Sequence, residues 1–419
     1  MKRISLFLYF SFSILALVAQ IQHDAIWLFG SPRLLPTDTQ FGGSMLDFKS
    51  GVPEASYFEL GIFLDPTATI CDENGELVFY TNGCKIMNAQ HEIMENGDTI
   101  NAGIRHEQYC AYSYPSIQGL LPIPSPANSN KYGLFHMKLD ESTLKFTSLL
   151  YSEINANHNG GLGQVTTIDQ LVSQDTFSSR LSAVKHANGR DWWVILEEKT
   201  RGNFHIIYYG PEGPQLSMQQ GIDFGIEDYQ ASGPTTFSPD GKKYVRINPI
   251  TNGVHILDFD RCYGILSNPI FIDFPDDTLG VTGASISGSN QFLYVSATEE
   301  IYQFDLSQEN IMESRQIVAY YDGYTVADFP TLQTTFGQLM SAPDGKIYGT
   351  APNSSNVLHI IHAPNEQGLA CNVEQHALEL PTLHSFAPPN FPHFRLWDIP
   401  GSPCDTLGID TPTDLEDIA

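Results

Sequence analysis

Residues that could do chemistry are scattered along this chain and do not form one complete motif. His91-Glu92-Ile93-Met94-Glu95 matches the start of a zinc-protease motif, but the second zinc-binding histidine is missing and no helix is expected there. Gly160-Gly161-Leu162-Gly163 lacks the downstream lysine of a phosphate-binding loop, and we interpret it as a connecting loop. Gly283-Ala284-Ser285-Ile286-Ser287 lacks the final glycine of a nucleophile elbow, which argues against a common α/β peptidase or esterase.

Two acidic stretches have the oxygen-rich composition of calcium loops. Asp72-Glu73-Asn74-Gly75-Glu76 lacks the bidentate glutamate that ends a twelve-residue calcium loop, and its residues suit a hairpin turn. Asp273-Phe274-Pro275-Asp276-Asp277 could bind calcium through loop carbonyls or form a solvated turn. We interpret both as turns. The sequence therefore assigns no metal site, no cofactor and no catalytic residue.

Aromatic and histidine residues on the predicted strands have a structural interpretation. Trp192-Trp193 could form a sugar-stacking platform or pack between sheets. Adjacent strand residues point to opposite faces of a sheet, which favours packing. The predicted strands also carry four scattered histidines, which we interpret as structural: His205, His255, His359 and His362.

The chain contains six cysteines, none of them in a CxxC pair or at zinc-finger spacing from histidines: Cys71, Cys84, Cys110, Cys262, Cys371 and Cys404. An even number in an exported chain allows three disulfides. We expect structural bridges or free thiols, and not a metal site. A bridge between Cys371 and Cys404 would close a short loop at the C-terminal end, and we predict that pairing.

Short hairpin signals recur at intervals of roughly 50 to 60 residues, which suits one four-stranded sheet per interval. Asn-Gly and Asp-Gly supply the positive φ values that a tight turn between twisted strands needs. The six signals are Glu73-Asn74-Gly75-Glu76, Asn128-Ser129-Asn130, Ala187-Asn188-Gly189, Pro239-Asp240-Gly241, Gly288-Ser289-Asn290 and Pro343-Asp344-Gly345. A strand follows each signal, and several of these strands, such as Trp192 to Leu196, are apolar on both faces. Such strands must be covered on both faces, as the blades of a β-propeller are.

We therefore predict an all-β propeller of seven four-stranded blades. The six hairpins account for six blades, and a propeller of six blades is the alternative to seven. The seventh blade is expected to join N-terminal strands at Ala25–Phe29 and Ser44–Phe48 with a C-terminal strand at Pro392–Trp397, which would remove two sheet edges. Helix content is expected to be very low.

The two ends of the chain are expected to lie outside this single domain, which we place at residues 20–400. Lys2 and Arg3 precede an apolar run that ends at Ala19-Gln20, as in a secretory signal peptide over residues 1–19; a retained signal anchor is the alternative. Residues 401–419 are rich in Pro, Asp and Thr and are expected to form an acidic, flexible tail. The formal net charge of −27 argues against binding to nucleic acids and to anionic lipids.

In the order and spacing of its motifs, the chain resembles the secreted β-propeller proteins of gliding bacteria that are associated with type IX secretion, a WD40/YVTN-like family. The resemblance covers nearly all of the mature chain. Its main motifs are Trp27-Leu28-Phe29-Gly30, Leu46-Asp47-Phe48, Asp72 to Gly83, Asn159 to Gly163, Ala183 to Trp193, Phe237 to Gly241, Leu257 to Asp260, Ala342 to Tyr348, Gly368 to Asn372 and Pro389-Asn390-Phe391. It implies export and an interaction module, and it supplies no catalytic residues. The small C-terminal sorting domain of that family is not found before Ala419.

From these observations we expect an exported, non-enzymatic propeller at the cell surface. It would act in adhesion or as a scaffold, binding an unidentified protein or glycan through loops on one face of the ring. The alternative is a metal-dependent hydrolase or lyase, whose carboxylates would converge on the central channel. Three or more acidic or histidine side chains meeting in that channel would favour the alternative.

Overall fold

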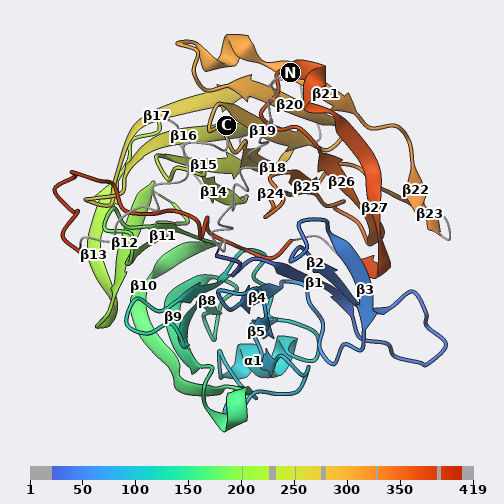
Figure 1. Ribbon diagram of the computed structural model, residues 1–419, viewed down its shortest axis with the longest axis vertical. Helices are drawn as coiled ribbons and strands as arrows, with labels where there is room; N and C mark the ends of the chain where they lie inside the picture. Colours follow the sequence, from blue (N-terminus) through green and yellow to red (C-terminus); the bar gives the residue numbers. More distant parts are fainter. Residues whose placement is uncertain are drawn as a thin grey trace, which may run out of the picture.

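The protein is a β-propeller, in which antiparallel sheets are arranged around a centre (Figure 1). The computed structural model describes residues 21–200, 202–225, 233–250, 252–274, 280–326, 329–384 and 388–407. The predicted signal peptide lies outside these residues, as does the part of the predicted tail after Leu407. No helix among the described residues is long and apolar enough to cross a membrane.

The N-terminal half contains three sheets. The first is β1 (Ile26–Ser31), β2 (Gly42–Asp47) and β3 (Glu54–Phe58), and the second is β4 (Ala68–Cys71), β5 (Leu77–Thr81) and β6 (Ile86–Asn88). The third has seven strands: β7 (Leu120–Pro124), β8 (Lys131–Leu139), β9 (Phe146–Asn155), β10 (Gln164–Lys185), β11 (Trp192–Glu198), β12 (Asn203–Gly210) and β13 (Gly213–Gly221).

The C-terminal half contains three four-stranded sheets and one ribbon. The sheets are β14 (Thr235–Phe237) with β15 (Lys243–Asn248), β16 (Gly253–Asp260) and β17 (Ile265–Asp273); β18 (Val281–Ile286) with β19 (Phe292–Ala297), β20 (Glu300–Asp305) and β21 (Gln316–Tyr320); and β24 (Leu339–Ser341) with β25 (Ile347–Gly349), β26 (Ser355–Ile361) and β27 (Val373–His384). The ribbon is β22 (Thr325–Val326) with β23 (Phe329–Gln333). The described helices are short: α1 (Ile104–Tyr109) and the 3₁₀ turns η1 (Asn159–Gly161), η2 (Ile311–Ser314) and η3 (Gly368–Cys371).

The six predicted hairpin turns are confirmed. They join β4 to β5, β7 to β8, β10 to β11, β14 to β15, β18 to β19 and β24 to β25, each pair antiparallel. Gly75 and Gly189 have φ values of 84° and 75°, a region that a residue with a Cβ rarely adopts. These turns lie at one end of the ring, because those at 72–76, 125–130 and 186–191 border one pocket and the Asp240 amide donates to Asn290 Oδ1 of the next sheet. We call this end the first-hairpin face.

Strand β10 belongs to two four-stranded units. Its first part pairs with β9 as far as Phe177, and its second part pairs with β11 from Leu181 to Lys185. The register shifts between Phe177 and Leu181, where the strand bends from the outside of one unit to the inside of the next. This bend lies at the end of the ring opposite the first-hairpin face, beside the β8–β9 turn and Lys199. We call that end the second-hairpin face.

The core lies between neighbouring sheets, as the doubly apolar strands predict. Trp192 packs in a cluster with Phe135, Tyr151 and Tyr209, whereas Trp193 packs in a different cluster with Ile206. Both indoles are buried. The interpretation of Trp192-Trp193 as packing residues on opposite faces of one strand is therefore confirmed.

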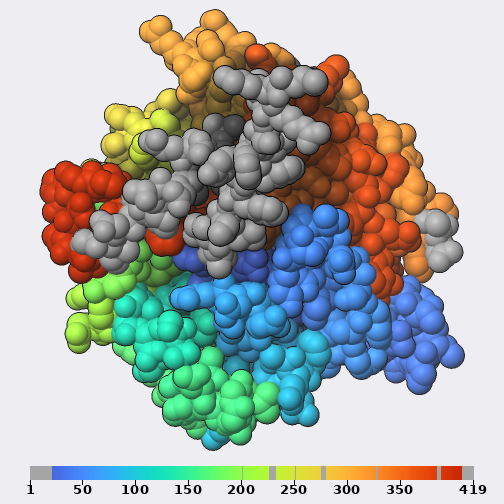
Figure 2. Space-filling view, viewed as in Figure 1, coloured from blue at the N-terminus to red at the C-terminus, as the bar shows by residue number. Residues whose placement is uncertain are grey.

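The prediction of a C-terminal strand at Pro392–Trp397 is wrong, since this segment contains no strand. Pro388, Pro389 and Pro392 lack the amide hydrogens that a strand ladder requires, which explains the difference. The strands β1, β2 and β3 instead form a sheet of N-terminal residues alone, and β27 packs beside it. Figure 2 shows the blue N-terminal strands and the orange-red C-terminal sheet side by side. The number of seven blades remains a prediction.

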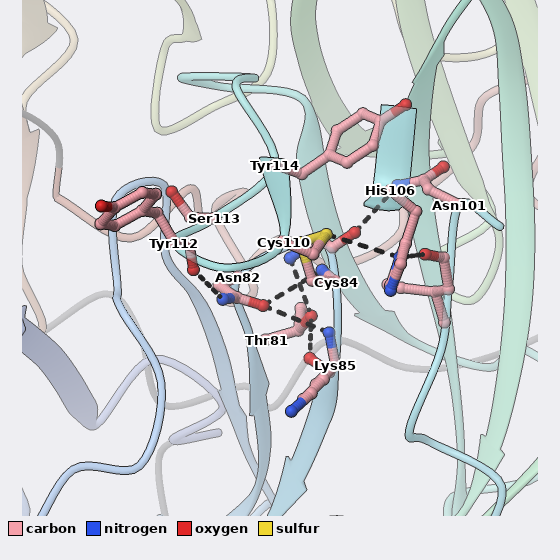
Figure 3. The surroundings of a disulfide bond; sticks show 12 residues. Thr81, Asn82, Cys84, Lys85, Asn101, His106, Cys110, Tyr112, Ser113 and Tyr114 are labelled. Atoms are coloured by element: carbon pink, nitrogen blue, oxygen red, sulfur yellow. Dashed lines mark hydrogen bonds between the residues drawn. A yellow bond between two sulfur atoms is a disulfide. The ribbon is translucent and has the colours of Figure 1, made fainter. Parts of the chain in front are cut away.

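Two disulfides join segments that are distant in the sequence. Cys84 bonds to Cys110 at the end of α1 (Figure 3), and Cys262 bonds to Cys404. Cys71 and Cys371 are buried free thiols. The predicted Cys371–Cys404 pair is therefore wrong, because the C-terminal segment runs to the neighbourhood of the β16–β17 turn that carries Cys262. Cys404 lies in the predicted flexible tail and is covalently attached to the propeller.

Candidate functional site

The central channel is largely filled by the segment that follows β27. Its Asn390 side-chain amide donates to the backbone carbonyls of Leu120 and Leu181, each at 3.0 Å. The remaining cavity is about 50 Å³. Asp24, the only carboxylate residue among its described lining, is paired with Arg395 at 2.6 Å. The convergence of carboxylates that the metal-dependent alternative requires is not seen in the described channel.

Most residues singled out in the sequence are occupied by structural contacts. Asp72 Oδ1 accepts the backbone amides of Asn74 and Glu76, which fixes the predicted turn. The His91 ring stacks on Phe58 outside any helix. The glycine cluster forms η1 in the loop between β9 and β10, within one sheet. Asp273 ends β17, and residues 275–277 lie outside the described part of the chain.

The other candidate positions also have structural partners. Ser285 lies on β18, where its Oγ is 2.8 Å from Ser341 Oγ. His255 and His359 are buried, and burial lowers the pKa of each, to about 3 and about 4 respectively, so both are neutral. His362 lies in an exposed pair with Glu374.

His205 belongs to a buried cluster that resembles a catalytic triad in composition. Its Nδ1 is 2.6 Å from Ser173 Oγ and its Nε2 is 3.2 Å from Glu198 Oε1. With Asp175, the two carboxylates and the imidazole form a group compact enough to hold a metal. Ser173 is only 6% exposed inside β10, so no substrate can approach its hydroxyl. We interpret this cluster as part of the core, as predicted for His205.

The turn between β10 and β11 is held rigid by a hydrogen-bonded network. Buried Asp191 accepts hydrogen bonds from Asn188 Nδ2 at 2.6 Å and from Arg190 Nε at 2.7 Å. Burial opposes the ionisation of Asp191, but hydrogen bonds from Arg190, Tyr208 and Asn188 lower its pKa. The Trp193 indole donates to the Arg261 carbonyl at 2.8 Å, which attaches this turn to the next sheet. Side chains beside this turn are therefore held in fixed positions.

A pocket of about 280 Å³, lined by both polar and apolar residues, lies on the first-hairpin face beside this turn. The β7–β8 turn contributes Ser125 to Ser129, and the β10–β11 turn contributes Gly189 and Arg190. Glu73 lines it from the β4–β5 turn. The remaining lining includes His23, Lys185, Trp192 and Phe394. We call this the Lys185 pocket.

Lys185 is the most perturbed group of this pocket. Its Nζ donates to the Gly189 carbonyl at 3.2 Å and lies 5.0 Å from the centre of the Trp192 ring, a cation–π distance. Burial, together with the positive charge of Arg261, lowers the pKa of Lys185 to about 8, although Glu73 and Asp191 oppose the shift. At neutral pH the pocket therefore holds a poorly hydrated ammonium, which attracts anions more strongly than an exposed lysine does.

His23 adds a hydrogen-bond acceptor to the pocket. Its Nδ1 lies 2.7 Å from the Cys71 carbonyl, an acceptor, so Nδ1 carries the hydrogen. Burial lowers the pKa of His23, so the ring is neutral and its Nε2 carries a lone pair. The pocket thus combines cations, a neutral acceptor, the hydroxyls of Ser125 and Ser129, and one carboxylate at its rim.

Sequence reasoning missed Lys185, His23 and Arg190 as functional residues. The run Ala183 to Trp193 was noted only as a motif of the family resemblance, and its Lys185 has no special spacing to other charged residues. Its burial depends on turns from two preceding sheets, at Glu73 and Ser125 to Ser129, which a local pattern does not reveal.

No family model matches the chain, and no curated protein sequence matches it. Three solved structures illustrate its likeness to known folds. The periplasmic gluconolactonase PpgL of Pseudomonas aeruginosa is 11% identical over 87% of this chain and 98% of its own, with a TM-score of 0.47. The Cps50 (Swd1) β-propeller domain of Myceliophteria thermophila is 9% identical over 79% and 91%, with a TM-score of 0.45. A quinonprotein alcohol dehydrogenase-like protein of Bacteroides thetaiotaomicron is 12% identical over 87% and 77%, with a TM-score of 0.41.

These names correct the expectation that the chain is not an enzyme. A periplasmic gluconolactonase is among the structures that it resembles, so proteins of this fold include enzymes. At such low identity the likeness concerns the fold, and it transfers no substrate to this chain. Nothing in these comparisons indicates gliding bacteria or type IX secretion.

Proposed function

We propose that the protein is an exported β-propeller that binds an acidic carbohydrate through the Lys185 pocket. The observation that carries this proposal is the half-buried Lys185 ammonium at the wall of a small pocket of mixed polar and apolar lining on the first-hairpin face. A sugar acid combines one carboxylate with several hydroxyls. The pocket offers the matching groups.

The chemistry of the lining supports this class of ligand. Lys185 supplies positive charge for a carboxylate, Arg190 lies beside it in an ion pair with Asp191, and Ser125, Ser129 and Glu73 can hydrogen-bond hydroxyls. The chain has a formal charge of −27, so an anion needs local cations to be held at all. A volume of about 280 Å³ lies just below the range typical of ligand pockets, about 300–1,000 Å³, which suits a ligand no larger than one sugar residue.

Two features support export of the protein. The sequence from Lys2 to Gln20 has the order of charges and apolar residues of a secretory signal peptide. The disulfides Cys84–Cys110 and Cys262–Cys404 are of the kind that persists in an oxidising compartment. A surface location, as in the secreted propellers that the sequence resembles, would expose the first-hairpin face to a glycan.

Calorimetric titration with glucuronate, galacturonate and glucose at pH 7 tests the proposal. We expect a uronate to bind and the neutral sugar to bind at least tenfold more weakly, because a hydrogen bond to a charged group contributes about 1.5–3 kcal/mol. Lys185→Met removes the ammonium, keeps most of the side-chain volume and is expected to weaken uronate binding tenfold or more.

Lys346→Met is the matched control. Lys346 also lies beside a first-hairpin turn, but it pairs with Asp344 and does not line the pocket. This variant should bind uronate as the unaltered protein does. Equal loss in both variants, or equal affinity for uronates and glucose, would contradict the proposal.

A further inference from the structure

A second pocket, of about 140 Å³, lies on the second-hairpin face at the bend of β10. Its wall is formed by the bend itself, from Phe177 to Arg180, by Lys145 and Phe146 of the β8–β9 turn, and by Lys199 after β11. Arg180 precedes Lys185 by five residues on the same strand, β10, whose second part runs from this bend to the first-hairpin face. We call it the Arg180 pocket.

Arg180 is half-buried, and it differs from Arg246, Arg261 and Arg395 in having no hydrogen-bond or ion-pair partner among the described residues. Arg246 Nε lies 3.1 Å from Glu197 Oε2, and Arg395 lies 2.6 Å from Asp24. Arg261 donates to the Lys185 and Trp397 carbonyls at 2.8 and 2.6 Å. Nη1 of Arg180 is shut off from solvent without a hydrogen-bond acceptor among the described residues. A buried donor nitrogen of a guanidinium is costly when it has no acceptor, so the missing partner of Nη1 requires an explanation.

The surroundings of Arg180 are positive and contain no compensating acid. The described lining holds Lys145 and Lys199 in addition to Arg180, and it holds no carboxylate. Burial alone lowers the pKa of Arg180 to about 10. Three cations at one small pocket are unexpected in a chain with only 21 Lys and Arg against 48 Asp and Glu. The acid that would neutralise them is not supplied by the described protein.

Ser178 adds a second unsatisfied donor. Its hydroxyl is buried without a hydrogen-bond partner among the described residues, and the residue lines the same pocket. Phe146 and Phe177 form apolar walls beside it. Hydrogen bonds between charged groups are stronger in such surroundings than in water. The guanidinium fork and the hydroxyl are donors that suit an oxyanion with several acceptor atoms.

We propose that the Arg180 pocket binds a phosphate- or sulfate-type oxyanion, held by Arg180 and Ser178 inside the pocket and by Lys145 and Lys199 at its rim. An anion with two negative charges matches three cations better than a carboxylate does. The group can be a free ion or the terminal group of a phosphorylated or sulfated ligand, because the pocket opens at the surface through Lys145 and Lys199, both exposed.

Calorimetric titration at constant ionic strength tests the site with four probes: inorganic phosphate, inorganic sulfate, glycerol 2-phosphate and chloride. We expect phosphate or sulfate to bind at least tenfold more tightly than chloride. Tighter binding of the free ion assigns the site to free oxyanions, and tighter binding of the ester assigns it to a phosphorylated ligand. No preference for any oxyanion over chloride would overturn the proposal.

Single substitutions show which residues bind the oxyanion. Arg180→Met is expected to weaken phosphate binding at least tenfold, and Lys199→Met, at an exposed position that cannot affect folding much, about threefold. Arg315→Met changes an exposed arginine beside Tyr302 and should leave binding unchanged. Lys185→Met should also retain phosphate binding, which separates this site from the Lys185 pocket. Loss of binding in Lys185→Met with retention in Arg180→Met would overturn the assignment.

Discussion

The second part of strand β10 carries a half-buried cation near each of its ends, Arg180 at the bend and Lys185 at the first-hairpin turn, and the surrounding protein compensates the two charges differently. Lys185 has the Gly189 carbonyl and the Trp192 ring beside it, with the charges of Glu73 and Asp191 nearby. Arg180 has no hydrogen-bond or ion-pair partner among the described residues, although burial lowers the pKa of both side chains. The difference shows that this fold can place a partner beside a cation inside the protein. Where the described protein places no partner beside such a cation, we infer that a ligand supplies the compensating group.

Arg246 provides the third case, in which a buried carboxylate supplies the opposite charge. Its guanidinium is fully buried, and Glu197 on the adjacent strand β11 carries the opposite charge. A pair of this kind contributes little net stability, yet each partner is strongly destabilising when left alone. The three cations therefore form a series from paired, through partly compensated, to unpaired.

The largest effect is expected when the paired case is converted into an unpaired one. Glu197→Gln leaves Arg246 buried without its charge partner and should lower the free energy of unfolding by about 3–5 kcal/mol. Urea denaturation measures this change. Glu374→Gln breaks the exposed pair with His362 and should cost less than about 1 kcal/mol. A cost for Glu197→Gln as small as that of the control would show that buried cations need no partner here.

A change of opposite sign is expected at Arg180. In buffer without phosphate or sulfate, Arg180→Met removes a buried unpaired charge and should raise the free energy of unfolding by about 1–3 kcal/mol. Adding phosphate should reverse the order of stabilities, since the oxyanion stabilises only the protein that binds it. The same denaturation experiment, with and without phosphate, measures both. If Arg180→Met is destabilised without phosphate to the extent expected for Glu197→Gln, Arg180 is a structural residue.

The smallest effect concerns the pH dependence of the Lys185 pocket. The pKa of Lys185 is lowered to about 8, so the ammonium that attracts a carboxylate is present below pH 8 and is lost above it. Affinity for a uronate should therefore fall about tenfold as the pH rises from 7 to 9. Lys185→Met should show weak binding with no such slope. A flat profile in the unaltered protein would assign uronate binding to other groups.

The architecture follows from local signals, whereas the sites do not. Asn188-Gly189 and Asp344-Gly345 determine their own turns through backbone conformation, so these turns could be predicted from neighbouring residues alone. The disulfide between Cys262 and Cys404 joins residues 142 apart in the sequence, and only the course of the chain around the ring brings them together. The strand predicted at Pro392–Trp397 is absent, because Pro392 cannot donate to a ladder and the segment instead lies against the inner strands of the ring.

The two pockets were missed for the same physical reason. Lys185 and Arg180 look like ordinary strand residues in the sequence, and their burial is produced by turns that lie elsewhere in the chain, such as Ser125 to Ser129 and Leu144 to Phe146. Charge compensation is a property of the assembled sheets. A missing partner can be recognised only when every neighbour is known.

A crystal structure of the protein with bound glucuronate or galacturonate tests the central claim most directly. The account predicts the sugar in the Lys185 pocket, with its carboxylate within hydrogen-bonding distance of Lys185 Nζ and its hydroxyls near Ser125, Ser129 or Glu73. A sugar bound elsewhere on the ring, or one in this pocket with its carboxylate turned away from Lys185, would contradict it.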